Sequence, residues 1–303
     1  MSRRLLSFWS RFVPQNLRSW IRNSPWIYGL LERIDFFVLY RSFWPQKIFF
    51  EETGTSISVD FKERRGRALL RSRARGQWYL KEKWLDAIEK MQPDLVIDVG
   101  ANYGEFAFLP RFAEHTAVIA LEANPKLMPW LEQSLASHPD RKKISLMQGI
   151  VGKKMGGTAT LHIDPGWSGR SSAVQHNESG IQCEVDMVSI DGIVTKLNIG
   201  KPKKLVFKID VEGYEEDVFA GMQSTLKSAD SVFGLIEFDC SLLRNANTDP
   251  VNLARALSQN RLMYYLDKKR VFKKFELPGD EKLIADDWST EFMVFSSDLV
   301  INI

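Results

Sequence analysis

The sequence predicts an α/β protein in which helices cover both faces of a doubly wound, mostly parallel sheet. From residue 92 onward, short apolar strand patterns alternate with helical patterns, and a glycine-containing turn follows the first strand. This alternation is typical of open sheets that bind ligands at the carboxyl ends of their strands. With 303 residues, 44% of them hydrophobic and 26% charged, the chain can bury a large core.

The elements are expected in a fixed order along the chain. Strands are predicted at "DLVIDVG" (94–100), "TAVIALEAN" (116–124), "KISLMQGIVG" (143–152), "KLVFKIDVEG" (204–213), "SVFGLIEFD" (231–239) and "RLMYYLD" (261–267). Helices are predicted from "YGEFAFLPRFA" (103–113), "PKLMPWLEQSLASH" (125–138), "YEEDVFAGMQSTL" (214–226) and "DPVNLARALSQN" (249–260). Pro129 should disturb the second helix or mark its late start. The last run, "EFMVFSS" (291–297), is expected at a sheet edge or as an inserted antiparallel strand.

An insertion interrupts this pattern between the third and fourth strands. "GTATLHID" (157–164) and "IQCEVDMVSIDGIV" (181–194) alternate polar and apolar residues, as half-exposed strands do. They flank the polar loop "PGWSGRSSAVQHNESG" (165–180). We therefore expect an inserted hairpin or a lid.

The N-terminal 75 residues are predicted to form a basic, aromatic, mainly helical extension. Residues 1–44 contain seven arginines against Glu32 and Asp35, with four tryptophans. These acids and Arg33 interrupt its best apolar run, so neither a transmembrane span nor a signal peptide is predicted. Two interpretations remain open: the segment packs on the main domain or a second subunit, or residues 1–45 form an amphipathic helix on an anionic membrane. A mitochondrial transit peptide is a third.

Other charged and metal-binding residue types give weaker indications. Residues 61–83 carry nine Lys or Arg against two acids, which predicts either attraction of an anionic substrate or a solvated face. Cys183 and Cys240 form no CxxC pair, which favours a reducing, cytoplasmic location. The four histidines lack metal-binding spacing, so no metal is predicted.

The turn after the first strand restricts the cofactor. Asp98, Gly100 and Gly104 form DxGxxxG, with Asn102 where a dinucleotide fingerprint needs glycine, and no P-loop lysine follows. S-adenosylmethionine fits better, because its carboxylate suits the N–H groups of a helix start near Gly104 and its amino group suits Asp98. Glu122, at the end of the second strand, is placed to accept the ribose hydroxyls.

Six segments in order resemble the FkbM family of methyltransferases: "DVGANYGEF", "LEANP", "GRSS", "VDMVSIDGIV", "KIDVEGYEEDVFAG" and "LIEFD". The resemblance covers about residues 76–296, so we expect a methyltransferase domain over 76–303 and an extension over 1–75. It implies a Rossmann-like fold of the class I methyltransferase type, S-adenosylmethionine as cofactor, and methylation of hydroxyl oxygens of sugars, polyketides or other secondary metabolites. Ala123 departs from the family pattern, which usually has proline there.

The predicted site residues fall into three groups. The cofactor is expected to contact Asp98, Gly100, Ala101, Asn102, Gly104, Glu122, Ala123, Asn124, Gly149 and Ile150. Asp210 and Glu212, after the fourth strand, are candidate general bases; the alternative is that Asp210 positions the cofactor or caps a helix while Glu212 holds the loop. Arg170, Ser171 and Ser172 in the inserted loop are expected either to contact the acceptor or to form a flexible polar loop. Lys208 is expected to pair with a carboxylate. Glu237, which ends the fifth strand at the same sheet edge, has a lower place among the candidate site residues.

The expected acceptor is a hydroxyl group of a small molecule or glycan. A nucleic-acid amino methyltransferase is disfavoured, because "DVEG" occupies the place of the [DN]PPY-like element that holds an extruded base. A cofactor-binding scaffold without turnover is the other alternative.

Overall fold

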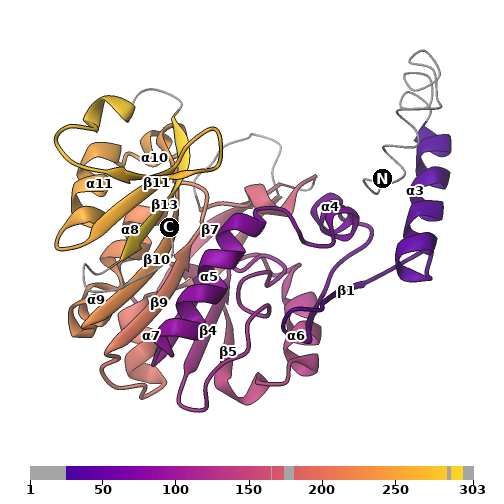
Figure 1. Ribbon diagram of the computed structural model, residues 1–303, viewed down its shortest axis with the longest axis horizontal. Helices are drawn as coiled ribbons and strands as arrows, with labels where there is room; N and C mark the ends of the chain where they lie inside the picture. Colours follow the sequence, from indigo (N-terminus) through magenta and orange to yellow (C-terminus); the bar gives the residue numbers. More distant parts are fainter. Residues whose placement is uncertain (1–24, 165, 174–180, 285–287, 296–303) are drawn as a thin grey trace.

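The centre of the protein is an eight-stranded sheet with the order β12-β11-β13-β10-β9-β3-β4-β5 (Figure 1). The structure is a computed structural model that describes residues 25–164, 166–173, 181–284 and 288–295. The sheet contains β3 (Leu95–Val99), β4 (Ala117–Glu122), β5 (Ile144–Gln148), β9 (Lys204–Ile209), β10 (Ser231–Asp239), β11 (Leu262–Leu266), β12 (Phe272–Phe275) and β13 (Ser289–Phe295). The predicted α/β fold is confirmed.

The pairing of the strands is mostly parallel on one side and antiparallel on the other. Strands β10, β9, β3, β4 and β5 pair in parallel. Strand β13 lies between β10 and β11 and is antiparallel to both, and β12 is antiparallel to β11. Every residue of β3 is buried, as expected of a central strand covered on both faces. The last strand is therefore inserted within the sheet, one of the two placements that the sequence predicted.

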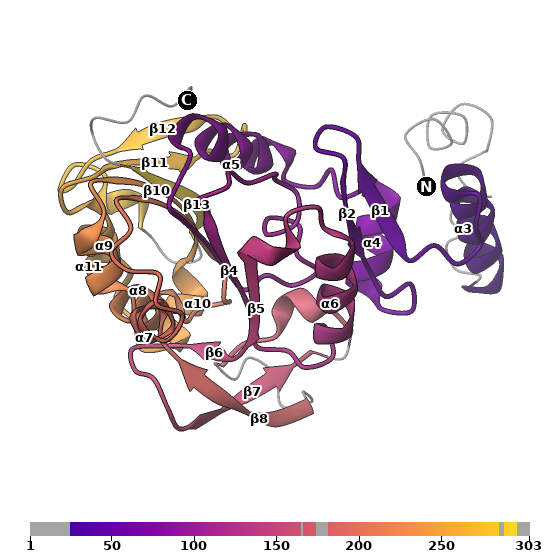
Figure 2. The same cartoon turned by 90° about the horizontal axis from the view of Figure 1, so that it is seen from below.

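Helices cover both faces of the sheet (Figure 2). One core joins Val96 and Val118 to α5 (Trp78–Met91), α6 (Met128–Ser137) and the N-terminal region. The opposite face, with Leu95 and Ile97, packs against the remaining helices. These are α7 (Ile190–Lys196), α8 (Glu215–Ala220), α9 (Gln223–Ser228), α10 (Cys240–Asn245) and α11 (Pro250–Ser258). Short 3-10 turns lie at η1 (Arg141–Lys143) and η3 (Glu281–Leu283).

The described part of the N-terminal region contains both helices and a hairpin. Its elements are α3 (Pro25–Tyr40), β1 (Lys47–Phe50), β2 (Thr55–Ser58) and α4 (Arg64–Ser72). The Thr55 hydroxyl donates to the Leu109 carbonyl at 2.9 Å, and the Ser58 N–H donates to the Ser134 hydroxyl at 2.8 Å. Leu70 belongs to the same core as the α5 residues. The hairpin and α4 are thus part of the main body, although the sequence predicted a mainly helical extension up to residue 75.

None of the helices in the described ranges is long and apolar enough to cross a membrane.

The insertion forms a small sheet of its own with the order β6-β8-β7. Its strands are β6 (Ile150–Val151), β7 (Thr158–Ile163) and β8 (Ile181–Val188). Strand β8 pairs antiparallel with β7, so the predicted hairpin is present. The short turn η2 (Ser168–Arg170) follows β7. Gly149 separates β5 from β6, which the sequence predicted as one strand.

The helix predicted over residues 103–113 does not form. This segment runs as consecutive turns, with a hydrogen bond of 2.7 Å from the Gly104 N–H to the Ala101 carbonyl. Gly104 has a φ of +81°, and Pro110 has no N–H to continue a helix. Phe106 and Phe108 are both buried, so the segment is held by its side chains rather than by a helical ladder. The predicted helix over 214–226 is also divided, into α8 and α9.

Candidate active site

A pocket of about 440 Å³ lies at the carboxyl ends of β3, β4, β9 and β10. This is the edge where an open α/β sheet binds its ligands. Ten of the residues predicted from the sequence line it: Gly100, Asn102, Glu122, Ala123, Gly149, Ile150, Ser171, Ser172, Asp210 and Glu212. Five others lie close by but do not line it: Asp98, Ala101, Gly104, Asn124 and Arg170.

The turn after β3 approaches the end of β9 very closely. Gly100 has a φ of +76°, and a Cβ atom there would lie 1.8 Å from the Asp210 carbonyl oxygen. Asn102 also has a positive φ, of +51°, and its side-chain oxygen is buried without a hydrogen-bond partner among the described residues. Gly100 is therefore required by the contact between two strand ends. Asn102 presents an unused acceptor beside the pocket.

Glu122 lies at the end of β4 with both carboxylate oxygens engaged. One accepts the Asn102 N–H at 2.7 Å, and the other accepts the Asn124 N–H at 2.8 Å. Burial raises the pKa of Glu122, and these two N–H groups oppose the rise. A carboxylate has about four acceptor sites, so Glu122 keeps lone pairs for two hydroxyl groups of a ligand. It thus has a structural role that the sequence did not predict, beside the predicted ribose contact.

Asp98 lies beneath the turn rather than on the pocket surface. It is fully buried, and within the described ranges neither carboxylate oxygen has a hydrogen-bond partner of ordinary geometry. The Lys208 Nζ lies 3.4 Å from its Oδ1. Burial raises the pKa of Asp98, and Lys208 opposes the rise. Direct contact between Asp98 and the cofactor amino group therefore stays a prediction.

Lys208 joins the turn after β3 to the end of β9. Its Nζ lies 3.3 Å from Asp210 Oδ2 and donates a hydrogen bond of 3.2 Å to the Gly100 carbonyl. Although burial acts against its charge, the carboxylates of Asp210 and Asp98 raise its pKa. The side chain therefore stays positive and holds two carboxylates together, in agreement with the expected pairing.

Three carboxylates meet in the pocket where β9 and β10 end. Oxygens of Asp210, Glu212 and Glu237 all lie within 4.8 Å of one another. Burial, followed by the charge of Asp210, raises the pKa of Glu212 to about 8. The same two causes raise the pKa of Glu237. At neutral pH this cluster therefore holds protons that isolated carboxylates would have lost.

The carboxylate cluster has the spacing that a metal ion would accept, although the sequence predicted no metal site. Lys208 already brings a positive charge to 3.3 Å from Asp210. The cluster can therefore balance its charge through Lys208 and through bound protons.

The backbone around Glu212 is held in an uncommon conformation. Glu212 has a φ of +56°, and a Cβ atom at Gly213 would lie 2.9 Å from the Leu242 carbonyl oxygen. Glu215 supports the turn, because its Oε1 accepts N–H groups from Val211 at 3.2 Å and Gly213 at 3.1 Å. Backbone strain of this kind persists only where the surrounding structure enforces it, and it is common at functional sites.

The inserted loop is tied to the carboxylate turn. The Ser172 hydroxyl donates to the Glu212 carbonyl at 2.8 Å, so it holds the loop in place. Ser171 accepts a long hydrogen bond of 3.4 Å from the Asn124 amide. Arg170 lies outside the pocket lining, and its charge lowers the pKa of Glu212 against the larger effects of burial and Asp210. Substrate contacts of these three residues stay predictions.

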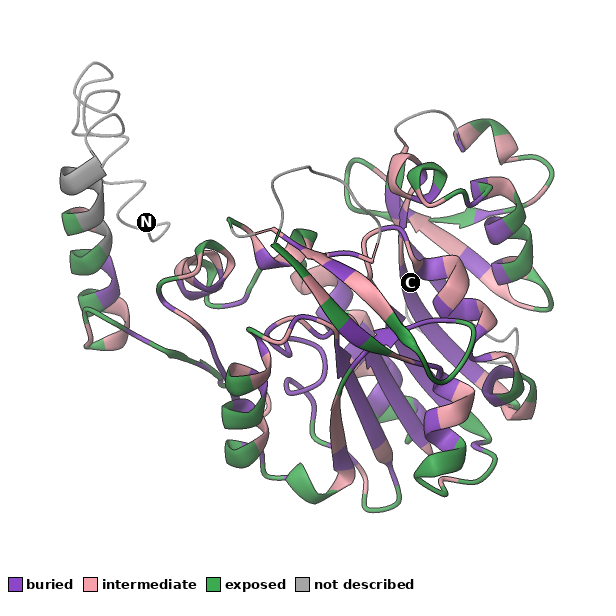
Figure 3. Ribbon diagram, turned by 180° about the vertical axis from the view of Figure 1, so that it is seen from behind, coloured by how far each residue is buried: buried purple, intermediate pink, exposed green. Residues whose placement is uncertain are grey.

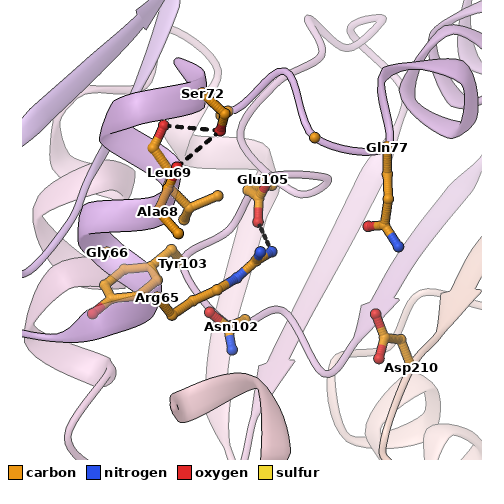
Figure 4. Close-up of polar contacts among 12 residues, drawn as sticks. Arg65, Gly66, Ala68, Leu69, Ser72, Gln77, Asn102, Tyr103, Glu105 and Asp210 are labelled. Carbon is orange, nitrogen blue, oxygen red and sulfur yellow. Dashed lines mark hydrogen bonds and ion pairs between the residues drawn. The ribbon is translucent and has the colours of Figure 1, made fainter. Parts of the chain in front are cut away.

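The wall that closes the pocket from the N-terminal side is formed by residues that the sequence did not predict to lie at the site. Arg65 of α4 forms an ion pair of 2.5 Å with Glu105, and Figure 4 shows it reaching into the space between α4 and Asp210. Gln77 also lines the pocket, and its amide points toward Asp210 in the same view. Trp167 lines it too, with the Arg65 guanidinium 5.7 Å from its ring centre. The basic character of residues 61–83 was the available signal, but it does not identify which residue faces the site.

The residues present fit S-adenosylmethionine. Glu122 offers free acceptor sites, Asn102 offers a buried unpaired oxygen, and Ile150 and Leu161 supply an apolar wall. These groups match a ribose, a polar amino-acid portion and an adenine ring. Asp210 and Glu212 line the same pocket.

The chain is similar to known methyltransferases. Residues 98–241 match the family described as the methyltransferase FkbM domain. The chain is also 26% identical over 180 residues to the hexuronic acid methyltransferase AglP of Haloferax volcanii, a match that covers 59% of this chain and 68% of that protein.

Solved structures share the fold only distantly. An O-methyltransferase from Bacillus cereus is 10% identical with a TM-score of 0.38, covering 72% of this chain and 81% of its own. The O-methyltransferase TomG from Streptomyces achromogenes is 8% identical with a TM-score of 0.40, covering 72% and 80%. The assignment therefore depends on the family match. Residues 98–241 match the methyltransferase FkbM domain, and the protein is an S-adenosylmethionine-dependent methyltransferase.

Proposed function

We propose that this protein methylates a hydroxyl group of a sugar or glycan, with Glu212 as the general base. The observation that carries the proposal is the position of Glu212, which lines the pocket and has a pKa raised to about 8 by burial and by Asp210. A carboxylate of ordinary pKa is a poor base for a hydroxyl, and a base whose pKa lies near the working pH is more effective. The similarity to a hexuronic acid methyltransferase supports a sugar acceptor.

The proposed step is a single displacement. When bound, S-adenosylmethionine supplies a methyl group on a positively charged sulfur. The acceptor oxygen forms the new C–O bond while the S–CH₃ bond breaks, and the hydroxyl proton passes to the Glu212 carboxylate. Asp210 faces Lys208 at 3.3 Å and contributes negative charge beside the base. Glu237 lies at the same point, and burial and the charge of Asp210 raise its pKa well above the usual value, so it adds a protonated carboxyl group beside the base.

The pocket supplies the second requirement of the reaction, which is the positioning of donor and acceptor. Holding donor and acceptor in line converts an encounter in solution into a reaction within one complex. Residues from α4, from the inserted loop and from the strand ends all line the pocket, so the acceptor is expected to bind between the inserted loop and Arg65.

The test compares wild type with Glu212→Gln, using Glu89→Gln on the exposed side of α5 as the matched control. Transfer of a labelled methyl group is measured against a set of methyl pyranosides, including a glucuronide, from acid to alkaline pH. Because the base must be ionised, the wild-type rate should rise with pH through about 8. Glu212→Gln should lower the rate by about 10²–10⁴-fold.

Titration calorimetry with S-adenosylmethionine separates chemistry from binding. We expect the same affinity for wild type and both variants, because Glu212 is proposed to act on the acceptor and not to hold the cofactor. Full activity of Glu212→Gln would show that another group takes the proton. Methylation confined to amines would contradict the hydroxyl acceptor.

A further inference from the structure

Residues on one face of the C-terminal half of helix α3 pack against the protein. Asp35 and Phe36 are buried, and the Phe36 ring meets the Phe61 ring at 5.2 Å between centres. The Tyr40 hydroxyl donates to the Leu70 carbonyl at 2.6 Å. These contacts fix the rotation of the helix about its axis.

The opposite face of α3 is apolar and exposed. Leu30, Ile34, Phe37 and Val38 follow the spacing i, i+4, i+7 and i+8, which places them on one side of a helix. Their exposed fractions range from 41% for Phe37 to 55% for Val38. Figure 3 shows α3 standing away from the main body, with exposed residues along much of its described length. This stripe differs from scattered surface leucines, because it is continuous.

Two aromatic residues extend the stripe beyond the end of α3. The Phe43 ring stacks on Phe37 at 4.5 Å, and Trp44 is 54% exposed. We call Leu30, Ile34, Phe37, Val38, Phe43 and Trp44 the apolar face. Arg33 lies over the Trp44 ring at 4.2 Å. Aromatic rings beside arginine are typical of the boundary between lipid headgroups and acyl chains.

Among the described side chains, the exposed charges next to the apolar face are positive. Arg33, Arg41 and Lys47 are exposed, whereas Asp35 is buried. The 24 residues before α3 contain five arginines and no acid. A negatively charged surface would therefore be attracted to this end of the chain.

We propose that the apolar face of α3 binds an anionic lipid bilayer, with its side chains in the interfacial region and the neighbouring arginines at the headgroups. This inference does not depend on the proposed methyl acceptor. Apolar area and positive charge act together in such helices, and neither alone gives firm binding. A second copy of the chain would also cover an apolar face, but it would bring the same positive charges to the contact.

The test measures flotation of the full chain with phosphatidylcholine vesicles, prepared with and without phosphatidylglycerol. One variant carries Leu30→Gln, Ile34→Gln and Phe37→Gln. Its matched control is Val271→Gln, since Val271 is 55% exposed and precedes β12, which lies far from α3 (Figure 2). Near-ultraviolet circular dichroism checks that each variant is folded.

Wild type and Val271→Gln should float with the anionic vesicles, and the triple variant should bind them about tenfold or more weakly. Arg33→Gln with Arg41→Gln leaves every apolar side chain in place. This double variant should bind anionic vesicles more weakly than wild type does, with no change in its binding to neutral vesicles. Raising the ionic strength from about 0.1 M to about 1 M should also weaken wild-type binding, because the Debye length falls from about 10 Å to about 3 Å.

Equal flotation of wild type and the triple variant would overturn the proposal, as would equal binding to neutral and anionic vesicles. Sedimentation velocity tests whether a second copy of the chain covers the apolar face instead of a bilayer. If wild type does not bind vesicles but is a dimer that the triple variant converts to a monomer, the apolar face is a contact between two copies. A wild type that is monomeric and binds neither vesicle type would also overturn the proposal.

Discussion

Replacing Lys208 with Met removes the cation that lies 3.4 Å from the fully buried carboxylate of Asp98. Lys208 is itself only 7% exposed, and methionine has a similar volume, so the main loss is charge. Removing one partner of a buried ion pair costs about 3–5 kcal/mol. The second contact, to Asp210, adds little because the Asp210 side chain is 37% exposed and solvent screens it. We expect the free energy of unfolding to fall by about 3–5 kcal/mol in total.

Urea denaturation followed by tryptophan fluorescence measures this loss. The matched control is Lys203→Met, because Lys203 pairs with Asp230 at 3.5 Å and both side chains are mostly exposed. An exposed pair contributes about 0–1 kcal/mol, so this variant should differ little from wild type. Both variants replace lysine with methionine and remove the same charge. The difference between their losses of unfolding free energy therefore measures the effect of burying the ion pair.

The effect of Lys208→Met on the free energy of unfolding should also depend on pH. Without Lys208, burial should raise the pKa of Asp98 further, and a group whose folded pKa is raised contributes more stability as pH falls. The difference in free energy of unfolding between wild type and Lys208→Met should therefore become smaller as the solution is acidified. A loss below about 1 kcal/mol at neutral pH, or a gap that widens on acidification, would refute the buried-pair interpretation.

Three further changes test other parts of the structure. Glu122→Gln should weaken S-adenosylmethionine binding by about tenfold to a hundredfold in calorimetry, because hydrogen bonds to a charged group are worth about 1.5–3 kcal/mol; unchanged affinity would rule out the ribose contact. Gly234→Ala would place a Cβ atom 2.4 Å from the Phe207 ring and should lower the free energy of unfolding, measured by urea denaturation, by about 1–3 kcal/mol, as overpacking does. Asp140 has its pKa lowered to about 2, since Arg111 and neighbouring donors outweigh burial. Asp140→Asn should therefore cost about 2 kcal/mol at neutral pH, and the wild-type advantage should disappear as pH falls from about 4 to about 2.

The sheet was predictable because its strands carry strong local signals. Each of β3, β4 and β9 is a run of mostly apolar residues followed by a turn, and a strand buried on both faces needs such a run. The order of these runs with helices between them then restricts the topology to few choices. Pro129 marked the start of α6 correctly, because proline is accepted in the first helical turn.

The turn over residues 101–113 was not predictable by the same reasoning. Its spacing of aromatic residues is compatible with a helix, but Phe106, Phe108 and Phe112 are all buried in one core. A helix would place Phe108 and Phe112 on one face and Phe106 on nearly the opposite face. Tertiary packing therefore overrides the local pattern, and only the three-dimensional neighbours reveal it.

The site was predictable in its strand-end residues and not in its N-terminal wall. Glu122 and Asp210 follow strands that lie near each other in the sheet, so their position follows from topology. Arg65 and Gln77 precede the first strand of the large sheet and reach the pocket through the packing of α4 and the start of α5. No spacing rule in the sequence connects them to the strand ends.

The placement of β13 has a consequence for how the chain is made. Strand β10 pairs with β9 on one edge, but its other edge pairs with β13, which is synthesised about 50 residues later. At roughly 5–20 residues per second, that edge of β10 waits several seconds on the ribosome with its N–H and C=O groups unpaired. Strand β11 is made before β13 and cannot take its place without leaving β13 outside the sheet. The nascent protein therefore passes through a stage with an open, apolar strand edge, which is the feature that chaperones shield and that neighbouring chains can join.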